Sequence, residues 1–225
     1  MIFNAFSCTN NVQKIAKNEY GLRVINTIEQ YQLTIKKDSS KKMVLLKNYV
    51  PNIIFDWKYA TKDNFTHQIL YNNPDAFMRI EAAENLQKVA EDLAKIGLGL
   101  KVFDAYRPYS ITQKMWQIVP DEKYAANPAK GSGHNRGIAV DITLYNLKNG
   151  QELLMPTAFD DFTEKAHTNY SNLEKQVLEN RAILINTMQK HGFIVLATEW
   201  WHFYLPNIEK YELMNIDFDE LRKIE

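Results

Sequence analysis

Two short segments, far apart in this chain, each carry side chains of the kinds that bind metal ions, and a fold that uses both must bring them together. Residues 132–141 (SGHNRGIAVD) contain His134 and Asp141, and residues 199–203 (EWWHF) contain His202. Two imidazoles and one carboxylate leave the fourth position of a zinc ion open, as in catalytic sites, whereas structural zinc sites fill all four positions, usually with cysteine. Because the chain contains a single cysteine, the pattern predicts a catalytic zinc site with these three residues as ligands.

Two further charged residues are candidates for the same site. Glu199 precedes His202 by three positions, and residues three apart on a regular strand face opposite sides of the sheet. Both can face one metal only where the strand bends, bulges or ends, so the sequence predicts an irregularity there. Arg107, in residues 104–108 (DAYRP), is by default a turn residue in a surface ion pair. Its functional interpretation is a cation aimed at a developing oxyanion.

The overall composition narrows the classes of partner. Lys and Arg total 27, as do Asp and Glu, and no dense basic block with interleaved aromatic residues is present, which argues against a nucleic-acid partner. No apolar run approaches the roughly 20 residues of a transmembrane helix. A length of 225 residues is that of one domain, with or without an appended arm. The apolar helix faces could form a core or an interface, so the pattern predicts no oligomeric state.

The segment around Cys8 (NAFSCTNN) bears on location. It looks like the end of a bacterial lipoprotein signal, but the apolar stretch over residues 1–6 is too short for a working signal peptide. We therefore expect a location in the bacterial cell envelope or periplasm, with attachment through Cys8. The alternative is a cytoplasmic protein in which Cys8 is an ordinary residue.

Residues 1–42 are polar and rich in Asn and Lys, and we expect them to form an N-terminal arm or the remnant of an export signal. Within them, residues 22–24 and 31–35 alternate weakly, as short strands do. Residues 37–42 (KDSSKK) indicate a solvated linker. The catalytic domain would then span residues 43–225.

Within that domain, helices and strands alternate imperfectly. The spacing of apolar residues predicts helices over 75–97 and 172–191, and strands over 98–102, 138–144 and 193–205. Asp141 lies on the second of these strands, and Glu199 and His202 lie on the third. Hairpin-like returns fit this order better than a fully parallel sheet does. The predicted class is α+β, a single domain with a central, largely antiparallel sheet flanked by helices.

Four segments together resemble a known family. In order along the chain they are 59–65 (YATKDNF), 104–108 (DAYRP), 132–141 (SGHNRGIAVD) and 199–202 (EWWH). In this combination they resemble the D-alanyl-D-alanine dipeptidases of the vancomycin-resistance type, from about residue 45 to about residue 207. Each segment alone is a weak signal, but the combination is highly specific.

The resemblance implies a role for each matching residue in the catalytic centre. His134, Asp141 and His202 match the zinc ligands, with one zinc ion per chain. Glu199 matches the catalytic base, and Arg107 matches the arginine that stabilises the transition state. The implied zinc ion agrees with the one predicted from the residues themselves.

The resemblance also implies a substrate pocket. Ser132, Tyr59 and Asp160 fall where the family has residues that line the dipeptide pocket, and Asp160 would suit the free ammonium of the substrate, since a buried cation needs a paired charge. Two departures bear on this pocket. Met155-Pro156 replaces the Met-Gly expected before Asp160, and the loop at 66–71 (THQILY) is shorter than the Gly-containing loop of the family.

The implied function is zinc-dependent hydrolysis of D-alanyl-D-alanine to D-alanine, by a zinc-activated water with Glu199 as general base and Arg107 as oxyanion stabiliser. One alternative is a D,D- or L,D-carboxypeptidase that acts on peptidoglycan stem peptides, because an opened pocket admits longer substrates. Another is a non-catalytic, zinc-stabilised module that binds wall peptides. The presence of Glu199 and Arg107 argues against that module, because binding alone needs no base.

Overall fold

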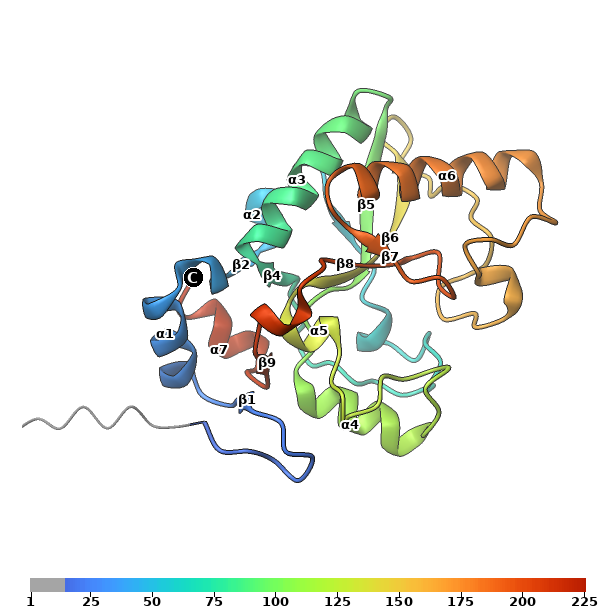
Figure 1. Ribbon diagram of the computed structural model, residues 1–225. Helices are drawn as coiled ribbons and strands as arrows, with labels where there is room; N and C mark the ends of the chain where they lie inside the picture. The colour runs from blue at the N-terminus through green and yellow to red at the C-terminus, as the bar shows by residue number, and fades with distance from the viewer. Residues whose placement is uncertain (1–14) are drawn as a thin grey trace, which may run out of the picture.

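A five-stranded sheet lies at the centre of the fold (Figure 1). The structure is a computed structural model and describes residues 15–225, so Cys8 lies outside the described residues and the location stays a prediction. The strands in this range are β1 (Val24–Ile25), β2 (Met43–Leu45), β3 (Ile54–Phe55), β4 (Phe77–Arg79), β5 (Leu98–Asp104), β6 (Ala139–Asn146), β7 (Ile194–Val195), β8 (His202–Tyr204) and β9 (Leu213–Met214).

Helices surround the strands. The α-helices in the same range are α1 (Ile28–Lys37), α2 (Leu46–Tyr49), α3 (Ile80–Ala94), α4 (Tyr109–Ile118), α5 (Gly133–Arg136), α6 (Lys175–Lys190) and α7 (Phe218–Arg222). Short 3-10 helices are η1 (Ser39–Lys41), η2 (Lys58–Ala60), η3 (Glu164–Ala166) and η4 (Ile208–Lys210).

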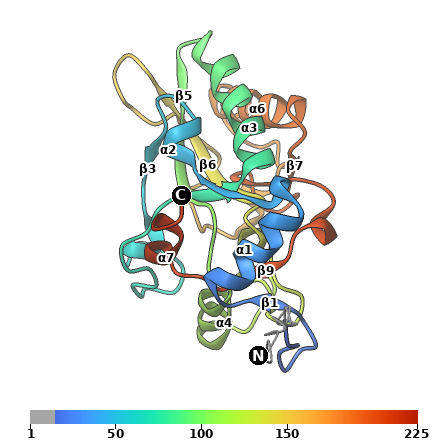
Figure 2. The same ribbon diagram turned by 90° about the vertical axis from the view of Figure 1, so that its left-hand side faces the viewer.

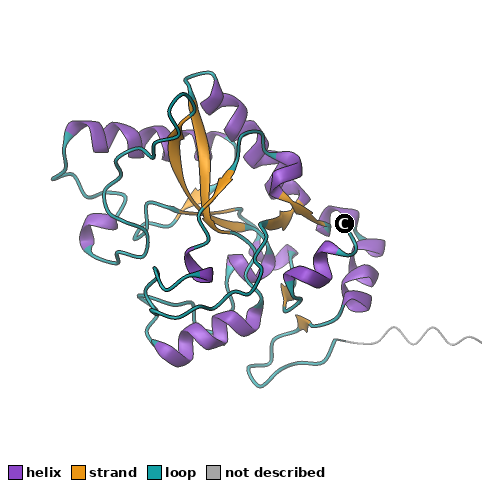
Figure 3. Ribbon diagram, turned by 180° about the vertical axis from the view of Figure 1, so that it is seen from behind, coloured by secondary structure: helices purple, strands orange, loops and turns teal. Residues whose placement is uncertain are grey.

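The central sheet has the strand order β3-β5-β6-β8-β7. Within this sheet, β3 and β5 are parallel, whereas β5–β6, β6–β8 and β7–β8 are antiparallel pairs. Figure 3 shows the strands in the middle of the molecule with the helices around them. The predicted α+β class, with a central and largely antiparallel sheet flanked by helices, is therefore confirmed.

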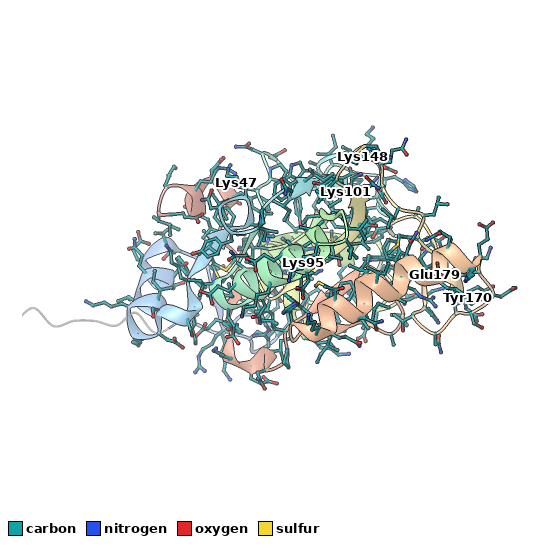
Figure 4. The ribbon with its side chains drawn as sticks, turned by 90° about the horizontal axis from the view of Figure 1, so that it is seen from above. Lys47, Lys95, Lys101, Lys148, Tyr170 and Glu179 are labelled. Carbon is teal, nitrogen blue, oxygen red and sulfur yellow. The ribbon has the colours of Figure 1, made fainter. Side chains whose placement is uncertain are left out.

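Helices α3 and α6 pack against the sheet and against each other. Figure 2 shows both on the same side of β5 and β6, and Figure 4 shows them side by side from above, with Lys95 and Glu179 at the surface. Leu86 and Leu93 of α3 and Leu184 of α6 are fully buried in this layer. Burial of one such side chain contributes about 1.5–3 kcal/mol, so the layer stabilises the strands beneath it.

The first predicted helix is shorter than the expected range 75–97. Phe77–Arg79 form strand β4, which pairs antiparallel with β2, and the helix begins only at Ile80. Every residue of β4 is buried. This pairing outweighs the helical spacing of Phe77, because tertiary contacts override local preference. The helix predicted over 172–191 agrees closely with α6.

The strand expected over residues 31–35 is wrong, because these residues lie in α1. The Thr27 hydroxyl caps this helix by accepting a hydrogen bond from the Gln30 amide at 3.3 Å, and such a cap contributes about 1 kcal/mol. Tyr31 is buried, and its hydroxyl accepts a hydrogen bond from the Met43 amide at 2.6 Å. Helical spacing, rather than alternation, therefore decides which side of this segment faces the core.

Residues 37–42, expected to be a solvated linker, instead form the end of α1 and η1. The Lys41 ammonium pairs with the Glu212 carboxylate at 2.6 Å, and β1 pairs in parallel with β9. Figure 2 shows β1 and β9 side by side. These early residues thus pack on the C-terminal part of the chain. In the range 15–225, no helix has both the length and the apolar character needed to cross a membrane.

Candidate active site

The two metal-binding segments meet because their strands are neighbours in the sheet. Asp141 on β6 is paired directly with His202, the first residue of β8. On the other side of β6, Asp104 at the end of β5 is paired with Asp141. The register shifts between Val102 and Asp104, and such bulges are common beside active sites because they re-aim side chains. Two carboxylates and an imidazole therefore stand in a row across three strands.

His134 comes from the short helix α5. Ser132 caps this helix: its hydroxyl accepts a hydrogen bond from the Asn135 amide at 3.2 Å. The Asn135 side-chain oxygen in turn accepts one from the Ser132 amide at 3.1 Å. Gly133 allows α5 to lie against β6, since a Cβ atom there would be 2.9 Å from the Cβ atom of Ala139. A larger residue at this position would push His134 away from the sheet.

A buried arginine holds the other end of α5. Arg79, on β4, is fully buried, and its Nε donates a hydrogen bond to the Arg136 carbonyl at 2.8 Å. Its backbone amide donates to the Gly137 carbonyl at 2.7 Å. Its two Nη groups donate to the carbonyl oxygens of Lys41 and Glu212. One side chain thus ties α5 to an early and a late segment of the chain.

His134, Asp141 and His202 converge on one point. His134 Nε2 lies 3.3 Å from Asp141 Oδ2 and 3.2 Å from His202 Nδ1. His202 Nδ1 lies 2.8 Å from Asp141 Oδ1. One ligand atom from each residue lies within 4.8 Å of the other two. The structure therefore brings together the three residues predicted to bind a metal.

The donor atoms of this cluster suit a zinc ion. The Nδ1 atom of His134 lies 2.7 Å from the Ala105 carbonyl oxygen. If that oxygen accepts the imidazole hydrogen, the lone pair is left on Nε2, the atom that faces Asp141 and His202. A metal-binding histidine commonly has such a partner on its other nitrogen. Two imidazoles and a carboxylate also match the ligand set of a catalytic zinc site.

The Asp141 carboxyl is ionised despite its burial. Burial by itself would raise the pKa of Asp141, but the neighbouring His134 and His202 outweigh this effect and hold the pKa well below its usual range. Burial would likewise lower the pKa of His134, yet the Asp141 carboxylate outweighs it, and the pKa of His134 is raised. Metal binding requires both imidazoles to be neutral, and in that state Asp141 supplies the one negative charge among the three ligands.

Glu199 lies in the turn between β7 and β8. The single strand predicted over 193–205 is wrong, because the chain folds back between two short strands: the Glu199 amide donates to the Leu196 carbonyl at 3.1 Å. The irregularity predicted between Glu199 and His202 is confirmed, and both residues line one cavity. Burial raises the pKa of Glu199 to about 7. A carboxyl group with such a pKa can take up and release protons near neutral pH.

Arg107 is buried and forms an ion pair in the interior, so the default expectation of a surface pair is wrong. Its Nε and Nη2 both donate to Asp104 Oδ2, at 2.9 and 2.7 Å. The Tyr71 hydroxyl donates to Asp104 Oδ1 at 2.8 Å. The guanidinium carbon lies 5.1 Å from the centre of the Tyr59 ring. Arg107 is thereby held in one orientation at the wall of the cavity that Glu199 also lines.

Asp160 lines this cavity as well, with Pro156 upstream in place of the expected glycine. Its Oδ1 accepts a hydrogen bond from the Tyr59 hydroxyl at 3.2 Å, and its Oδ2 accepts one from the Phe65 amide at 3.1 Å. Its backbone is left-handed, with φ 61°, a conformation that aspartate adopts more readily than most residues. Burial raises the pKa of Asp160 to about 7, so a cation beside it would favour its charged form.

A cavity of about 290 Å³ collects all eight residues predicted for the site. They are Tyr59, Arg107, Ser132, His134, Asp141, Asp160, Glu199 and His202. The sequence prediction missed other parts of the wall, among them Glu122, Tyr124 and Phe162, which stand in loops without a recognisable motif. It also missed Asp104. Asp104 stands three residues before Arg107 at the end of a strand, and no sequence motif distinguishes their ion pair.

Comparison with known proteins shows the family of this chain. The model of the D-ala-D-ala dipeptidase family, peptidase family M15, matches residues 39–220. The chain is 33% identical over 177 residues to a D-alanyl-D-alanine dipeptidase of Escherichia coli (strain K12), a match that covers 79% of this chain and 91% of the relative. It is 33% identical over 193 residues to a D-alanyl-D-alanine dipeptidase of Enterococcus faecium, with 77% and 95% covered.

Among solved structures, the chain is similar to the LdcB LD-carboxypeptidase, with 18% sequence identity, a TM-score of 0.43, and 72% of this chain and 67% of that chain covered. The assignment to a family rests on the family model and on the two dipeptidases. By these matches the chain belongs to the D-Ala-D-Ala dipeptidase family of M15 peptidases and is a metallopeptidase.

Proposed function

We propose that this protein hydrolyses D-alanyl-D-alanine to D-alanine in a zinc-dependent reaction. The observation that carries the proposal is the cavity of about 290 Å³, in which the metal-binding cluster shares one space with Glu199, Arg107 and Asp160. This volume lies just below the usual range for small-molecule pockets, about 300–1,000 Å³, which suits a substrate as small as a dipeptide. Two dipeptidases among the relatives support the same substrate.

His134, Asp141 and His202 would hold the zinc ion, one per chain. Zinc in such a site polarises a carbonyl oxygen and lowers the pKa of water to about 7. The contact between His134 Nδ1 and the Ala105 carbonyl fixes the orientation of the imidazole, so the cluster is arranged before the ion binds.

Glu199 acts first as general base and then as general acid. Its carboxylate takes a proton from the attacking water while the water oxygen bonds to the carbonyl carbon of the first D-alanine. The same carboxyl group gives that proton to the leaving amine nitrogen as the C–N bond breaks. Glu199 is then a carboxylate again, as at the start of the reaction. A pKa near 7 suits both transfers.

Arg107 stabilises the negative charge that develops on the oxygen of that carbonyl. Its guanidinium stays charged at every relevant pH, and the ion pair with Asp104 fixes its orientation. A cation held in place beside a developing oxyanion in a site shielded from water contributes several kcal/mol to the stability of the transition state.

Asp160 binds the free ammonium of the dipeptide. The cation pairs with a carboxylate that is partly buried and forms no salt bridge with any of residues 15–225. Tyr59 positions that carboxylate through its hydroxyl. The Ser132 oxygen accepts the Asn135 amide hydrogen in the cap of α5, which leaves its hydroxyl hydrogen to donate to the substrate.

The test is the release of D-alanine from D-Ala-D-Ala by purified protein of measured zinc content. We expect turnover that stops with a chelator and returns with zinc, and no turnover of L-Ala-L-Ala. A pentapeptide that ends in D-Ala-D-Ala is the comparison substrate, and faster hydrolysis of it would make the protein a D,D-carboxypeptidase. Zinc-loaded protein that hydrolyses none of the three would instead support a wall-peptide-binding module.

A further inference from the structure

A second hollow lies directly beside the active-site cavity. Its lining residues are Phe65, Val119, Lys123, Tyr124, Asp160, Asp161, Phe162 and Thr163. Three of these, Tyr124, Asp160 and Phe162, also line the active-site cavity. These three side chains therefore form the wall between the two spaces.

The wall is built mainly from aromatic contacts. The rings of Tyr124 and Phe162 meet edge to face, with centroids 5.1 Å apart and an interplanar angle of 74°. Phe162 also contacts Phe65 at 5.7 Å and the buried Trp201 at 6.0 Å. Tyr124 is 37% exposed and lies in the turn that follows α4. Phe162 is thus held in place by its contacts with Phe65 and Trp201, whereas Tyr124 forms the solvent-exposed part of the wall.

The position of Asp160 places this wall where a peptide longer than a dipeptide would have to extend. Asp160 is the residue that we propose binds the free ammonium of the dipeptide, and it lines both spaces. In a longer peptide, that nitrogen carries a further residue in place of the free ammonium. The added residue would have to extend from the active-site cavity towards the second hollow, past Tyr124 and Phe162.

We infer that Tyr124 and Phe162 set the upper limit on substrate length, by closing the active site at the amino end of a dipeptide. The inference rests on the proposed function, because it concerns the substrate of that same site. The two rings occupy the space that an added residue needs, and Phe162 offers no partner for the added peptide group. One extra or missing methylene in an apolar pocket changes kcat/KM by about 10–200-fold, and a whole residue is larger.

The experiment compares kcat/KM for the dipeptide D-Ala-D-Ala with that for the tripeptide L-Ala-D-Ala-D-Ala in the zinc-loaded protein. In Tyr124→Ala, and separately in Phe162→Ala, we expect the ratio of tripeptide to dipeptide to rise at least about tenfold over the wild-type ratio. Tyr20→Ala is the matched control, because Tyr20 is 44% exposed and lies outside both linings. Its ratio should equal that of the wild type.

Tyr124→Ala is the primary variant, because Tyr124 is a partly exposed loop residue, whereas Phe162 also packs on the core. Dipeptide turnover by a variant shows that the variant is folded. An unchanged ratio in both variants, with dipeptide turnover retained, would overturn the inference, as would equal use of the two peptides by the wild type. A wild type without dipeptide turnover would overturn the proposed function and, with it, this inference.

Discussion

Arg107 donates two hydrogen bonds to one oxygen of Asp104, from Nε at 2.9 Å and from Nη2 at 2.7 Å. Asp104 is 1% exposed, and its other oxygen accepts hydrogen bonds from the Tyr71 hydroxyl and the Ala105 amide. The carbonyl oxygen of Ala105 in turn contacts Nδ1 of His134. Two consecutive residues, Asp104 at the end of β5 and Ala105 directly after it, therefore orient both the arginine and one histidine of the metal site.

Replacing Asp104 with asparagine should lower kcat by about 10- to 100-fold, because a small misplacement of an oriented group has effects of this size. KM should change little, since Arg107 acts mainly in the transition state. In an Arg107→Ala background the same replacement should have little further effect on kcat, because Asp104 acts through Arg107. Asp92→Asn, which breaks ion pairs with Lys95 and Lys190 outside the cavity, is the control. Independent effects of the two replacements would contradict this relationship.

Glu199→Gln should bind zinc as the wild type does but lose about 10²- to 10⁴-fold in kcat, the usual contribution of a general acid–base group. The glutamine side chain has a similar shape and cannot take up the proton of the attacking water. Metal analysis and steady-state kinetics on the same sample check both parts. Normal turnover by this variant would remove Glu199 from the mechanism.

His134→Ala and His202→Ala should each lower the zinc content and abolish the stabilisation that zinc brings. Ligand at a hundred times its Kd stabilises a folded protein by about 2.7 kcal/mol, so zinc should raise the Tm of the wild type clearly. His191→Ala is the control, because His191 pairs with Asp92 at 2.8 Å and lies outside the cavity lining. Unchanged zinc stoichiometry in both variants would refute the ligand assignment.

Asp160→Asn should stabilise the zinc-free protein at pH 8 and have little effect near pH 4. Burial raises the pKa of Asp160 from 3.8 to about 7 in the folded state, so the folded protein holds this proton more tightly than the unfolded chain. The wild type therefore loses stability as pH rises from about 4 to about 7. One pKa unit corresponds to about 1.4 kcal/mol, and we expect a gain of about 1–4 kcal/mol at pH 8. Urea unfolding with a chelator at both pH values measures it, and equal gains would contradict the titration.

The meeting of the metal-binding residues was predictable because its signals are local. His134 and His202 stand in short segments of restricted residue types, and the alternation around Asp141 marks a strand. Neighbouring antiparallel strands then bring Asp141 and His202 together. The spacing between Glu199 and His202 required a bend, a bulge or a strand end, and the structure has a turn before β8.

Features that depend on distant contacts were not predictable in this way. The segment around Tyr31 alternates weakly, yet it is helical, and the buried Tyr31 hydroxyl finds its partner in the Met43 amide, outside the helix. The contact between Tyr124 and Phe162 joins two loops, and no local spacing or motif predicts it. Arg107 was by default expected in a surface ion pair, and its buried pair with Asp104 was missed, because burial depends on what covers the turn.

Because of the hydrogen bonds that Arg79 donates, shortening this enzyme to residues 43–225 would lower its stability. Such a shortened protein would lack the Lys41 carbonyl that one Nη group needs, and an unsatisfied buried donor costs about 1–3 kcal/mol, more for a charged group. The loosened guanidinium also bonds to Arg136, the last residue of α5, so the damage would reach the histidine on that helix. Residues 24–42 support the active site, so a fusion partner or an immobilisation tag should not replace them.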